Sequence, residues 1–532
     1  MDSTTAIVQI VLGLLVAVGA LVTIARRIEI PYPILLVVGG LILGLVPGLP
    51  SIELKPEIVL LLFLPPLLYW ESLNTSFRDF RADLRAILLL SIGLVLATTC
   101  VVAVVAHMFI GLSWPTAFVL GAIISPTDTV AAAAIAQRLR LPRRIVTVLG
   151  GESLVNDATA LVLYVTAVDT VTGGSFSFLN AVVRFLGANI GGVLLGLAVG
   201  WCIVQIRRYL HDPPVENTLS LLSGFAAYLP ATTLQASGVL AVLTMGLYLG
   251  RRGPSIVSSQ TCLQAVQVWE IVVFLLNGLI FILIGLQLHS ILTTLTRRSI
   301  TTLILQAALV SLTVILVRII WVFPGAYLPR FVSRWVRERD PYPSWKAVVV
   351  VGWTGMRGGV SLAAALALPL VANTKTNAPF PDRDIIIFLT FSVILATLVV
   401  QGLSLPPLIR LLKLPGDTSE EHEEAKARLK AARAAMARLD ELSSEEWIYP
   451  DIIEDLRSHF SDQDRRFTAR FHNTEDGDDQ ERRAESYQRL KIELIGAERR
   501  TIIDLRNRGI INDDVMRRIQ RDLDLEEVRL QP

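Results

Sequence analysis

Cysteine and histidine are scarce in this 532-residue chain, which has three cysteines and six histidines. Cys100, Cys202 and Cys262 stand singly in or beside apolar stretches, with no metal-binding spacing and no disulfide framework. We therefore expect them to be small buried hydrophobic side chains. The formal net charge of +2 gives no sign of a nucleic-acid partner, and none is expected. No ATPase motif or catalytic set is recognisable, so we expect neither an enzyme nor a cofactor.

Hydrophobic residues, in contrast, are abundant. They make up 52% of the chain, above the roughly 45–50% of ordinary globular proteins. Residues 1–413 hold long apolar runs, whereas residues 414–532 are rich in acidic and basic side chains. This division predicts an all-α polytopic membrane domain over 1–413, followed by a helical cytoplasmic tail over 414–532. In the tail we expect helices at 421–442, 481–505 and 512–529, and an acidic linker at 473–480, with a role in regulation or subunit contact or as a solvated appendage.

About thirteen apolar segments approach the roughly 20 residues needed to cross a bilayer. Lysine and arginine concentrate in the loops after odd-numbered segments, and such loops face the cytoplasm. We therefore predict a multi-pass protein of the cell membrane with its N-terminus outside and its tail in the cytoplasm. The segments lie near 5–25, 33–49, 57–71, 84–110, 114–137, 145–169, 179–206, 216–234, 237–250, 262–288, 299–323, 345–373 and 384–412.

The sixth apolar segment carries Glu152, Ser153, Asn156 and Asp157 near its middle. A carboxylate at mid-bilayer costs about 2.5–3.5 kcal/mol on insertion scales, so it faces a partner or a water-filled cavity. On a helix, Ser153 and Asp157 share one face, and Glu152 and Asn156 form an adjacent stripe. A satisfied contact between helices is the alternative. Four polar residues together favour a site for a cation and a proton.

Two other apolar segments carry a charge at a predicted break in the helix. Pro126 removes a backbone donor, and Thr127 and Asp128 follow it directly. Around Arg357, four glycines loosen the helix of segment 345–373. A buried arginine needs carboxylates or carbonyls as partners, and Glu152 and Asp128 are available. Paired broken helices in two halves of a chain indicate a transport site between inverted repeats.

Three further polar residues lie in apolar segments. Glu71 follows the Pro65–Pro66 pair at the inner end of its segment, where an interfacial charge is favoured over a ligand. Glu270 is a candidate cavity residue, and Asn277 is favoured as a contact between helices.

Six motifs resemble those of bacterial sodium/proton antiporters, in the NhaP-like and animal exchanger-like branch of the cation:proton antiporters. The likeness runs in order through residues 5–413, and Thr129 is a departure because many relatives carry proline there. The motifs are FLPPLLYWESL, SPTDTVA, GGESLVNDATALVLY, FLLNGLIFILIGLQL, GWTGMRGGVSLAAALALP and TFSVILATLVVQGLSLPPL.

The resemblance implies thirteen spans with two inverted six-helix repeats and crossed discontinuous helices, in a homodimer with a mobile core. It also implies the parts of an ion site. Na⁺ would be held by the Asp157 carboxylate, the Ser153 hydroxyl, the Thr127 backbone oxygen and Asp128, with Asn156 orienting, Glu152 close by and Arg357 neutralising the crossed helices. The Asn156–Asp157 pair is similar to that of the electroneutral branch.

Physical chemistry gives a mechanism for such a site. Burial disfavours the carboxylate anion, so a proton and a dehydrated Na⁺ compete for Asp157. Either one neutralises it, whereas the empty anion is costly to move through a low dielectric. This predicts electroneutral exchange of Na⁺ or Li⁺ for H⁺ by alternating access, serving pH and sodium homeostasis. A K⁺/H⁺ antiporter is the alternative, and a cation channel or a non-transporting receptor fits less well.

Overall fold

A computed structural model gives the fold as two compact units, Met1–Gly416 and Asp417–Pro532. The structure describes residues 3–28, 30–45, 59–128, 132, 136, 139, 141–173, 178–210, 212–253, 256–294, 299–340, 342–373, 378–414, 419–443, 449–472, 476–508, 510 and 512–530. Thr129 and parts of the second, third and fifth predicted segments lie outside these residues.

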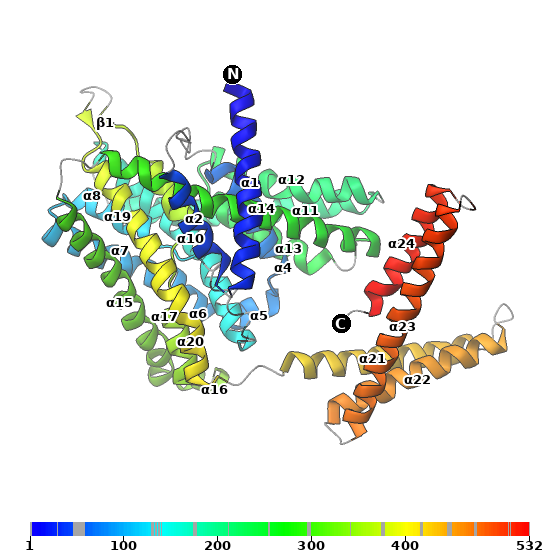
Figure 1. Cartoon of the computed structure of the whole chain (residues 1–532). Helices are drawn as coiled ribbons and strands as arrows, with labels where there is room; N and C mark the ends of the chain where they lie inside the picture. Colours follow the sequence, from blue (N-terminus) through cyan, green and yellow to red (C-terminus); the bar gives the residue numbers. More distant parts are fainter. Residues whose placement is uncertain are drawn as a thin grey trace. The chain divides into compact units, whose positions relative to one another are not determined.

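The first unit is a bundle of helices, as the sequence predicts (Figure 1). Its first half contains α1 (Ser3–Arg27), α2 (Tyr32–Gly44), η1 (Val59–Phe63), α4 (Leu64–Asn74), α5 (Phe77–Ala82), α6 (Leu84–Leu88), η2 (Leu89–Leu94), α7 (Val95–Val105), η3 (Ala106–Ile110), α8 (Trp114–Ile124) and α10 (Arg143–Val171). Its second half contains α11 (Phe178–Arg207), α12 (Pro213–Thr233), α13 (Gly238–Arg252), α14 (Ser259–Thr294), α15 (Ile300–Val332), α16 (Arg334–Arg339), α17 (Trp345–Trp353), α18 (Gly359–Leu366), β1 (Val371–Asn373), β2 (Ala378–Pro379), α19 (Arg383–Ala396), η5 (Thr397–Gln401) and α20 (Gly402–Leu412).

Six helical stretches among the described residues are long and apolar enough to cross a membrane by themselves. They are 84–110, 143–171, 182–207, 260–287, 300–332 and 383–412. Shorter apolar helices, such as α2 and α8, accompany them. The predicted class of polytopic helical protein is confirmed, and the count of thirteen spans stays a prediction.

Both predicted helix breaks are present and meet each other. α8 ends at Ile124, and residues 125–128 are not helical. The other break separates α17 from α18, over residues 354–358. The backbone N–H of Asp128 donates to the Met356 carbonyl over 2.8 Å. This bond joins the two helix breaks. It satisfies an N–H and a carbonyl that a regular helix would have satisfied within itself.

Close packing elsewhere depends on glycine. α2 and α14 approach so closely that a Cβ at Gly40 would overlap the Ile282 carbonyl, and one at Gly285 would overlap the Val37 carbonyl. Small residues let membrane helices pack backbone to backbone. The three cysteines, in contrast, are exposed on the surface of the chain, so the expectation that they are buried is wrong.

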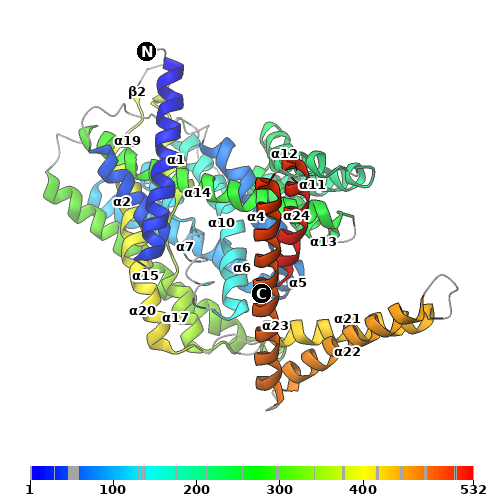
Figure 2. The same cartoon turned by 45° about the vertical axis from the view of Figure 1, so that its right-hand side comes forward.

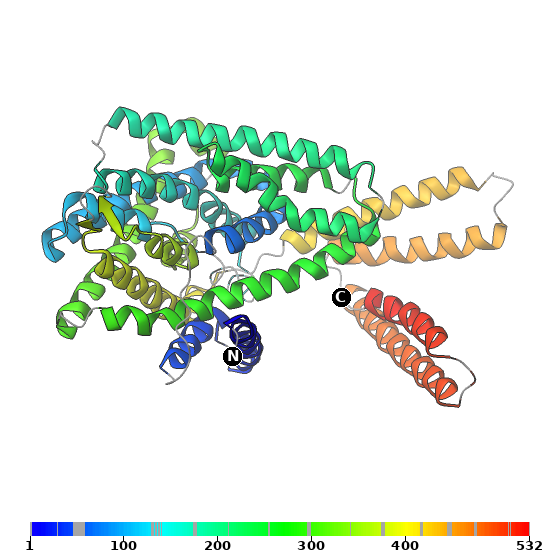
Figure 3. The same cartoon turned by 90° about the horizontal axis from the view of Figure 1, so that it is seen from above.

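The second unit consists of helices alone among its described residues. α21 (Ser419–Leu442) pairs with α22 (Pro450–His472), and α23 (Asp476–Asn507) pairs with α24 (Asp513–Leu530), as Figures 2 and 3 show. Ion pairs join each couple, such as Arg433–Asp464 at 2.8 Å and Arg499–Glu527 at 2.7 Å. The sequence did not predict α22, and the expected linker at 473–480 is wrong from Asp476 onward because α23 already begins there.

Candidate functional site

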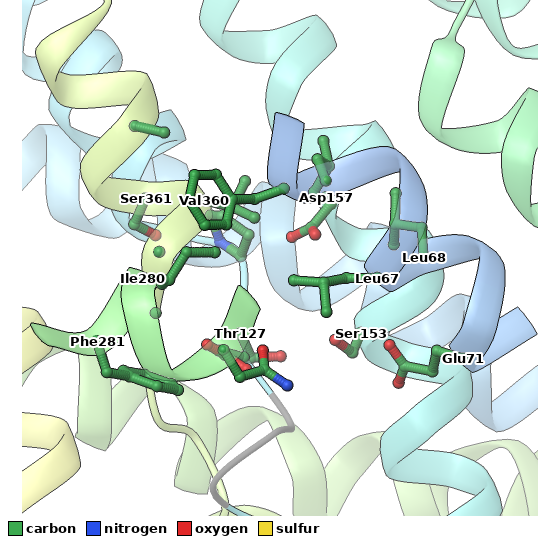
Figure 4. Close-up of a pocket in the computed structure, with 18 residues that line it drawn as sticks. Leu67, Leu68, Glu71, Thr127, Ser153, Asp157, Ile280, Phe281, Val360 and Ser361 are labelled. Carbon is green, nitrogen blue, oxygen red and sulfur yellow. The ribbon is translucent and has the colours of Figure 1, made fainter. Parts of the chain in front are cut away.

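A cavity of about 80 Å³ lies where α10 faces the two breaks (Figure 4). In Figure 4, Asp157, Ser153 and Glu71 lie on one side of the cavity, and Ile280, Val360 and Ser361 lie on the other. The polar residues that line it are Glu71, Thr127, Asp128, Ser153, Asp157, Asn277 and Ser361. Residues from five separate stretches of sequence therefore converge on one pocket.

Helix α10 presents its polar residues in the two predicted stripes. Ser153 and Asp157 line the cavity, and both are buried. Glu152 and Asn156 are buried too but do not line it. The four-residue spacing of Ser153 and Asp157 on a regular helix explains their shared face.

Asn156 holds the unwound segment after α8. Its Nδ2 donates to the Thr127 hydroxyl over 2.7 Å and to the Thr127 carbonyl over 3.3 Å. The Thr127 hydroxyl in turn donates to the Glu152 carboxylate over 2.9 Å. This chain of hydrogen bonds fixes Thr127 beside the cavity. The Thr127 carbonyl oxygen already accepts one hydrogen bond, from Asn156.

Asp128 reaches the cavity next to Gly358. A Cβ at Gly358 would overlap the Asp128 carboxylate, so only glycine permits this approach. The carboxylate thereby lines the same pocket as Asp157. Thr127, Asp128, Ser153 and Asp157, four of the predicted site residues, are thus brought together.

Glu152 is paired with an arginine that the sequence analysis did not single out. Arg318 of α15 donates from Nη1 and Nη2 to the two Glu152 carboxylate oxygens, over 2.5 and 2.8 Å. Both side chains are 1% exposed, and Arg318 Nε also donates to the Val351 carbonyl over 3.1 Å. A lone arginine within an apolar run was the available signal, because such a charge needs a partner in the bundle.

Arg357 has carbonyl partners in place of the carboxylates considered from the sequence. Its Nε donates to the Ile124 carbonyl over 2.9 Å, and its Nη1 donates to the Gly355 carbonyl. Its backbone N–H donates to the Thr397 hydroxyl over 3.1 Å. Arg357 thus joins the end of α8 to the break before α18 and to η5.

Of the three further polar residues, two line the cavity and one does not. Glu71 lines the cavity, so it is not merely an interfacial charge. Asn277 lines it as well. Glu270 is exposed and is not among the lining residues, so its candidate role as a cavity residue is wrong.

The cavity offers mainly hard oxygen donors, which suit alkali cations better than soft metals. Glu71, Asp128 and Asp157 supply carboxylates, and Ser153 supplies a hydroxyl. Within the described part of the chain, no three acidic, histidine or cysteine side chains form a cluster that could hold a metal ion. A cation here would therefore need hydroxyl and backbone oxygens as well as carboxylates.

The profile of the transmembrane sodium/hydrogen exchanger family matches residues 13–411. The chain belongs to this family. A Mycobacterium tuberculosis protein named as an uncharacterized Na⁺/H⁺ exchanger is 38% identical over 524 residues, covering 98% of this chain and 96% of its own. The Na⁺/H⁺ antiporter ApNhaP of Aphanothece halophytica is 33% identical, over 77% of this chain and 76% of its own.

One further relative and one solved structure are also similar to the chain. A sodium, potassium, lithium and rubidium/H⁺ antiporter of Bacillus subtilis is 33% identical, over 71% of this chain and 58% of its own. Among solved structures, the sodium proton antiporter MjNhaP1 of Methanocaldococcus jannaschii superposes with a TM-score of 0.61. It is 23% identical, and the match covers 78% of this chain and all of that one, which shows a common fold.

Proposed function

We propose that this Na⁺/H⁺ antiporter exchanges Na⁺ or Li⁺ for H⁺ electroneutrally by alternating access, with both ions competing for Asp157. One observation carries this assignment: Asp128 and the buried side chains of Ser153 and Asp157 line one small cavity where two helix breaks meet. The ligands of Na⁺ would be Asp157, Ser153, Asp128 and the Thr127 backbone oxygen. Asn156 would orient Thr127, and Glu71 would be a further carboxylate within reach.

Competition at one carboxylate explains coupling. Either ion neutralises Asp157, so the loaded site crosses the low-dielectric barrier more easily than the empty anion. One-for-one exchange also requires that the neighbouring carboxylates keep a constant charge. Glu152 is held in a two-pronged ion pair with Arg318 and does not line the cavity.

Two versions of this function differ in the cation that is exchanged, Na⁺ or K⁺. A hard oxygen cavity admits K⁺ as well as Na⁺ when its size allows. The name of the Bacillus subtilis relative includes both ions, which keeps K⁺/H⁺ exchange as the second candidate. A channel has no need of a titrating carboxylate at its centre and is the less favoured alternative.

Replacing Asp157 with Asn should abolish exchange. The purified chain is placed in sealed liposomes that contain a pH dye, a pH gradient is imposed, and Na⁺, Li⁺ or K⁺ is added with the membrane potential clamped or free. We expect the wild type to respond to Na⁺ and Li⁺ regardless of potential, and Asp157→Asn to give no response. The physical reason is that a neutral amide neither takes up the proton nor balances the cation.

The matched control is Asp169→Asn, the same change on the same helix at an exposed residue paired with Arg184. It should exchange normally. Full activity of Asp157→Asn would contradict the site, and a response to K⁺ alone would move the function to K⁺/H⁺ exchange.

We also propose the setting of this activity. The protein would form a homodimer in the cell membrane, with its N-terminus outside and its tail in the cytoplasm, and would serve pH and sodium homeostasis. The orientation is supported by the concentration of arginines beside the ends of α1, α13 and α15 and the start of α10. Impermeant labels applied to intact cells should reach single cysteines placed after α10 but not after α13.

A further inference from the structure

A second cavity lies in the first unit, at the predicted cytoplasmic ends of α6, α10, α15 and α17. Its volume is about 330 Å³, four times that of the ion pocket. Its walls are apolar and include Leu89, Leu90, Ile145, Val148, Val322 and Ala326. Figure 1 shows the adjoining ends of α15 and α17 near α16. This cavity is separate from the ion site, and the proposed transport chemistry makes no use of it.

Three arginines stand at this cavity: Arg85, Arg144 and Arg330. All three donate to the Asp340 carboxylate, over 2.6, 2.6 and 2.7 Å. Asp83 adds a second carboxylate, 2.9 Å from Arg144. Three guanidinium groups against these two carboxylates leave one positive charge in the cluster.

One donor of the cluster is unused. Arg85 Nε is buried and makes no hydrogen bond within the described part of the chain. A buried donor on a cation is costly to leave unpaired, and an anionic oxygen satisfies it best. This atom has almost no accessible surface, so an anion reaches it only when the Arg85 side chain turns, and the net positive charge is what the cluster offers to a ligand.

The depth of the cavity matches the level of lipid headgroups. The membrane-spanning stretches begin at Leu84 and Arg143, and the cavity extends inward to Leu90 and Val148, one to two helical turns further. Trp345, next to the lining residue Ser344, is 58% exposed, as is typical of tryptophan at a membrane interface. The charged side chains thus lie at the predicted cytoplasmic end of the cavity, and its apolar walls lie deeper in the membrane.

We propose that this cavity binds an anionic phospholipid of the cytoplasmic leaflet. The phosphate would lie at Arg85 and Arg144, and the first part of an acyl chain would lie against Val148, Val322 and Ala326. Basic pockets between membrane helices on the cytoplasmic side are typical sites for anionic headgroups. The apolar walls favour a lipid over free phosphate, which would leave them uncovered.

The structure also provides a way to fill the cavity. Gly325 lines it, and a Cβ at this position would meet no atom within 4 Å. Gly325→Leu should therefore narrow the acyl-chain space, since its Cβ meets no protein atom. Gly187 on α11 is a matched control, since its Cβ would also meet nothing within 4 Å and it does not line this cavity.

The test uses photoactivatable phosphatidylglycerol, with a diazirine in its acyl chain, in phosphatidylcholine vesicles that hold the purified full-length chain. Photoactivatable phosphatidylcholine is used in parallel, and labelled peptides are identified by mass spectrometry. We expect phosphatidylglycerol to label residues 145–148 and 322–326 about fivefold more than phosphatidylcholine does. Gly325→Leu should remove this labelling, and Gly187→Leu should retain it. Arg85→Gln should lower the preference for phosphatidylglycerol while labelling itself persists.

Three results would overturn the proposal. Equal labelling by both lipids would contradict the headgroup contact. Persistence of the labels in Gly325→Leu would place the lipid elsewhere. A photoreactive amino acid can also be placed at position 325. If it crosslinks to residues 419–530 in preference to lipid, the occupant of the cavity is the chain's own tail.

Discussion

Among the single residues near the ion pocket, Glu152 and Arg318 form a fully buried ion pair. Both side chains are 1% exposed, so neither charge is solvated by bulk water. Four hydrogen bonds offset this loss. Two join Arg318 to Glu152, a third runs from the Thr127 hydroxyl to Glu152, and a fourth runs from Arg318 to the Val351 carbonyl. The pair thus joins α10 to α15 across the bundle.

Removal of one partner should destabilise the fold strongly. In Arg318→Gln, the buried Glu152 loses its counter-charge, which costs about 3–5 kcal/mol. Thermal unfolding in detergent and the yield of folded protein would measure the loss. The double variant Arg318→Gln with Glu152→Gln should recover much of it, because no uncompensated charge remains.

The exposed pair Arg184–Asp169 serves as the control. Arg184→Gln should change stability by less than about 1 kcal/mol, since both partners are solvated. If Arg318→Gln were as stable as Arg184→Gln, the buried pair would have no structural role.

At the scale of elements, the site depends on the contact between two helix breaks. Asp128 bonds to the Met356 carbonyl, and its carboxylate lies against Gly358. Arg357 bonds to the Ile124 carbonyl at the end of α8. These bonds satisfy the Asp128 N–H and the Met356 and Ile124 carbonyls across the two breaks, as a low dielectric requires.

A methyl group at the crossing should disrupt it. Gly358→Ala places a Cβ in the space of the Asp128 carboxylate, so either the carboxylate or the break must move. We expect exchange to fall at least tenfold, measured in the liposome assay. Gly352→Ala in α17 is the matched control, because its nearest neighbour would be 3.8 Å away, and it should remain active.

At the scale of the whole first unit, Asp340 holds three segments together. Its carboxylate accepts from Arg85 at the start of α6, Arg144 at the start of α10 and Arg330 near the end of α15. Burial alone would raise the pKa of Asp340, but the hydrogen bonds and charges of Arg144 and Arg330 hold it below its ordinary value. This cluster fixes the predicted cytoplasmic ends of three helices.

Asp340→Asn should lower the stability of the unit by about 1–2 kcal/mol, between the values for exposed and buried pairs. The pKa of Asp340 is lowered in the folded state, so its stabilising effect is present above the unfolded pKa of about 3.9 and is lost as pH falls through the folded pKa. The difference in melting temperature between wild type and variant should thus be constant from neutral pH down to about 5 and shrink below about 4. A difference that grew on acidification would contradict this role.

The two compact units should be separable. We propose that a chain ending at Gly416 folds and exchanges ions, because the contacts of each unit lie mainly within that unit. Circular dichroism and the liposome assay would test the truncated chain against the full one. Unchanged basal exchange with an altered pH dependence would indicate regulation by the tail, whereas failure to fold would show that the division is wrong.

Local chemistry accounts for the part of the site that spacing along the chain predicts. Helical periodicity is enough to place Ser153 and Asp157 on one face, and proline and glycine are enough to place the breaks at Pro126 and around Arg357. The contacts between side chains from distant segments depend on the tertiary structure. Glu152 pairs with Arg318, 166 residues away, and Glu71 turns into the cavity. Neither contact follows from spacing along the chain, because the packing of distant helices sets which side chains share a desolvated space.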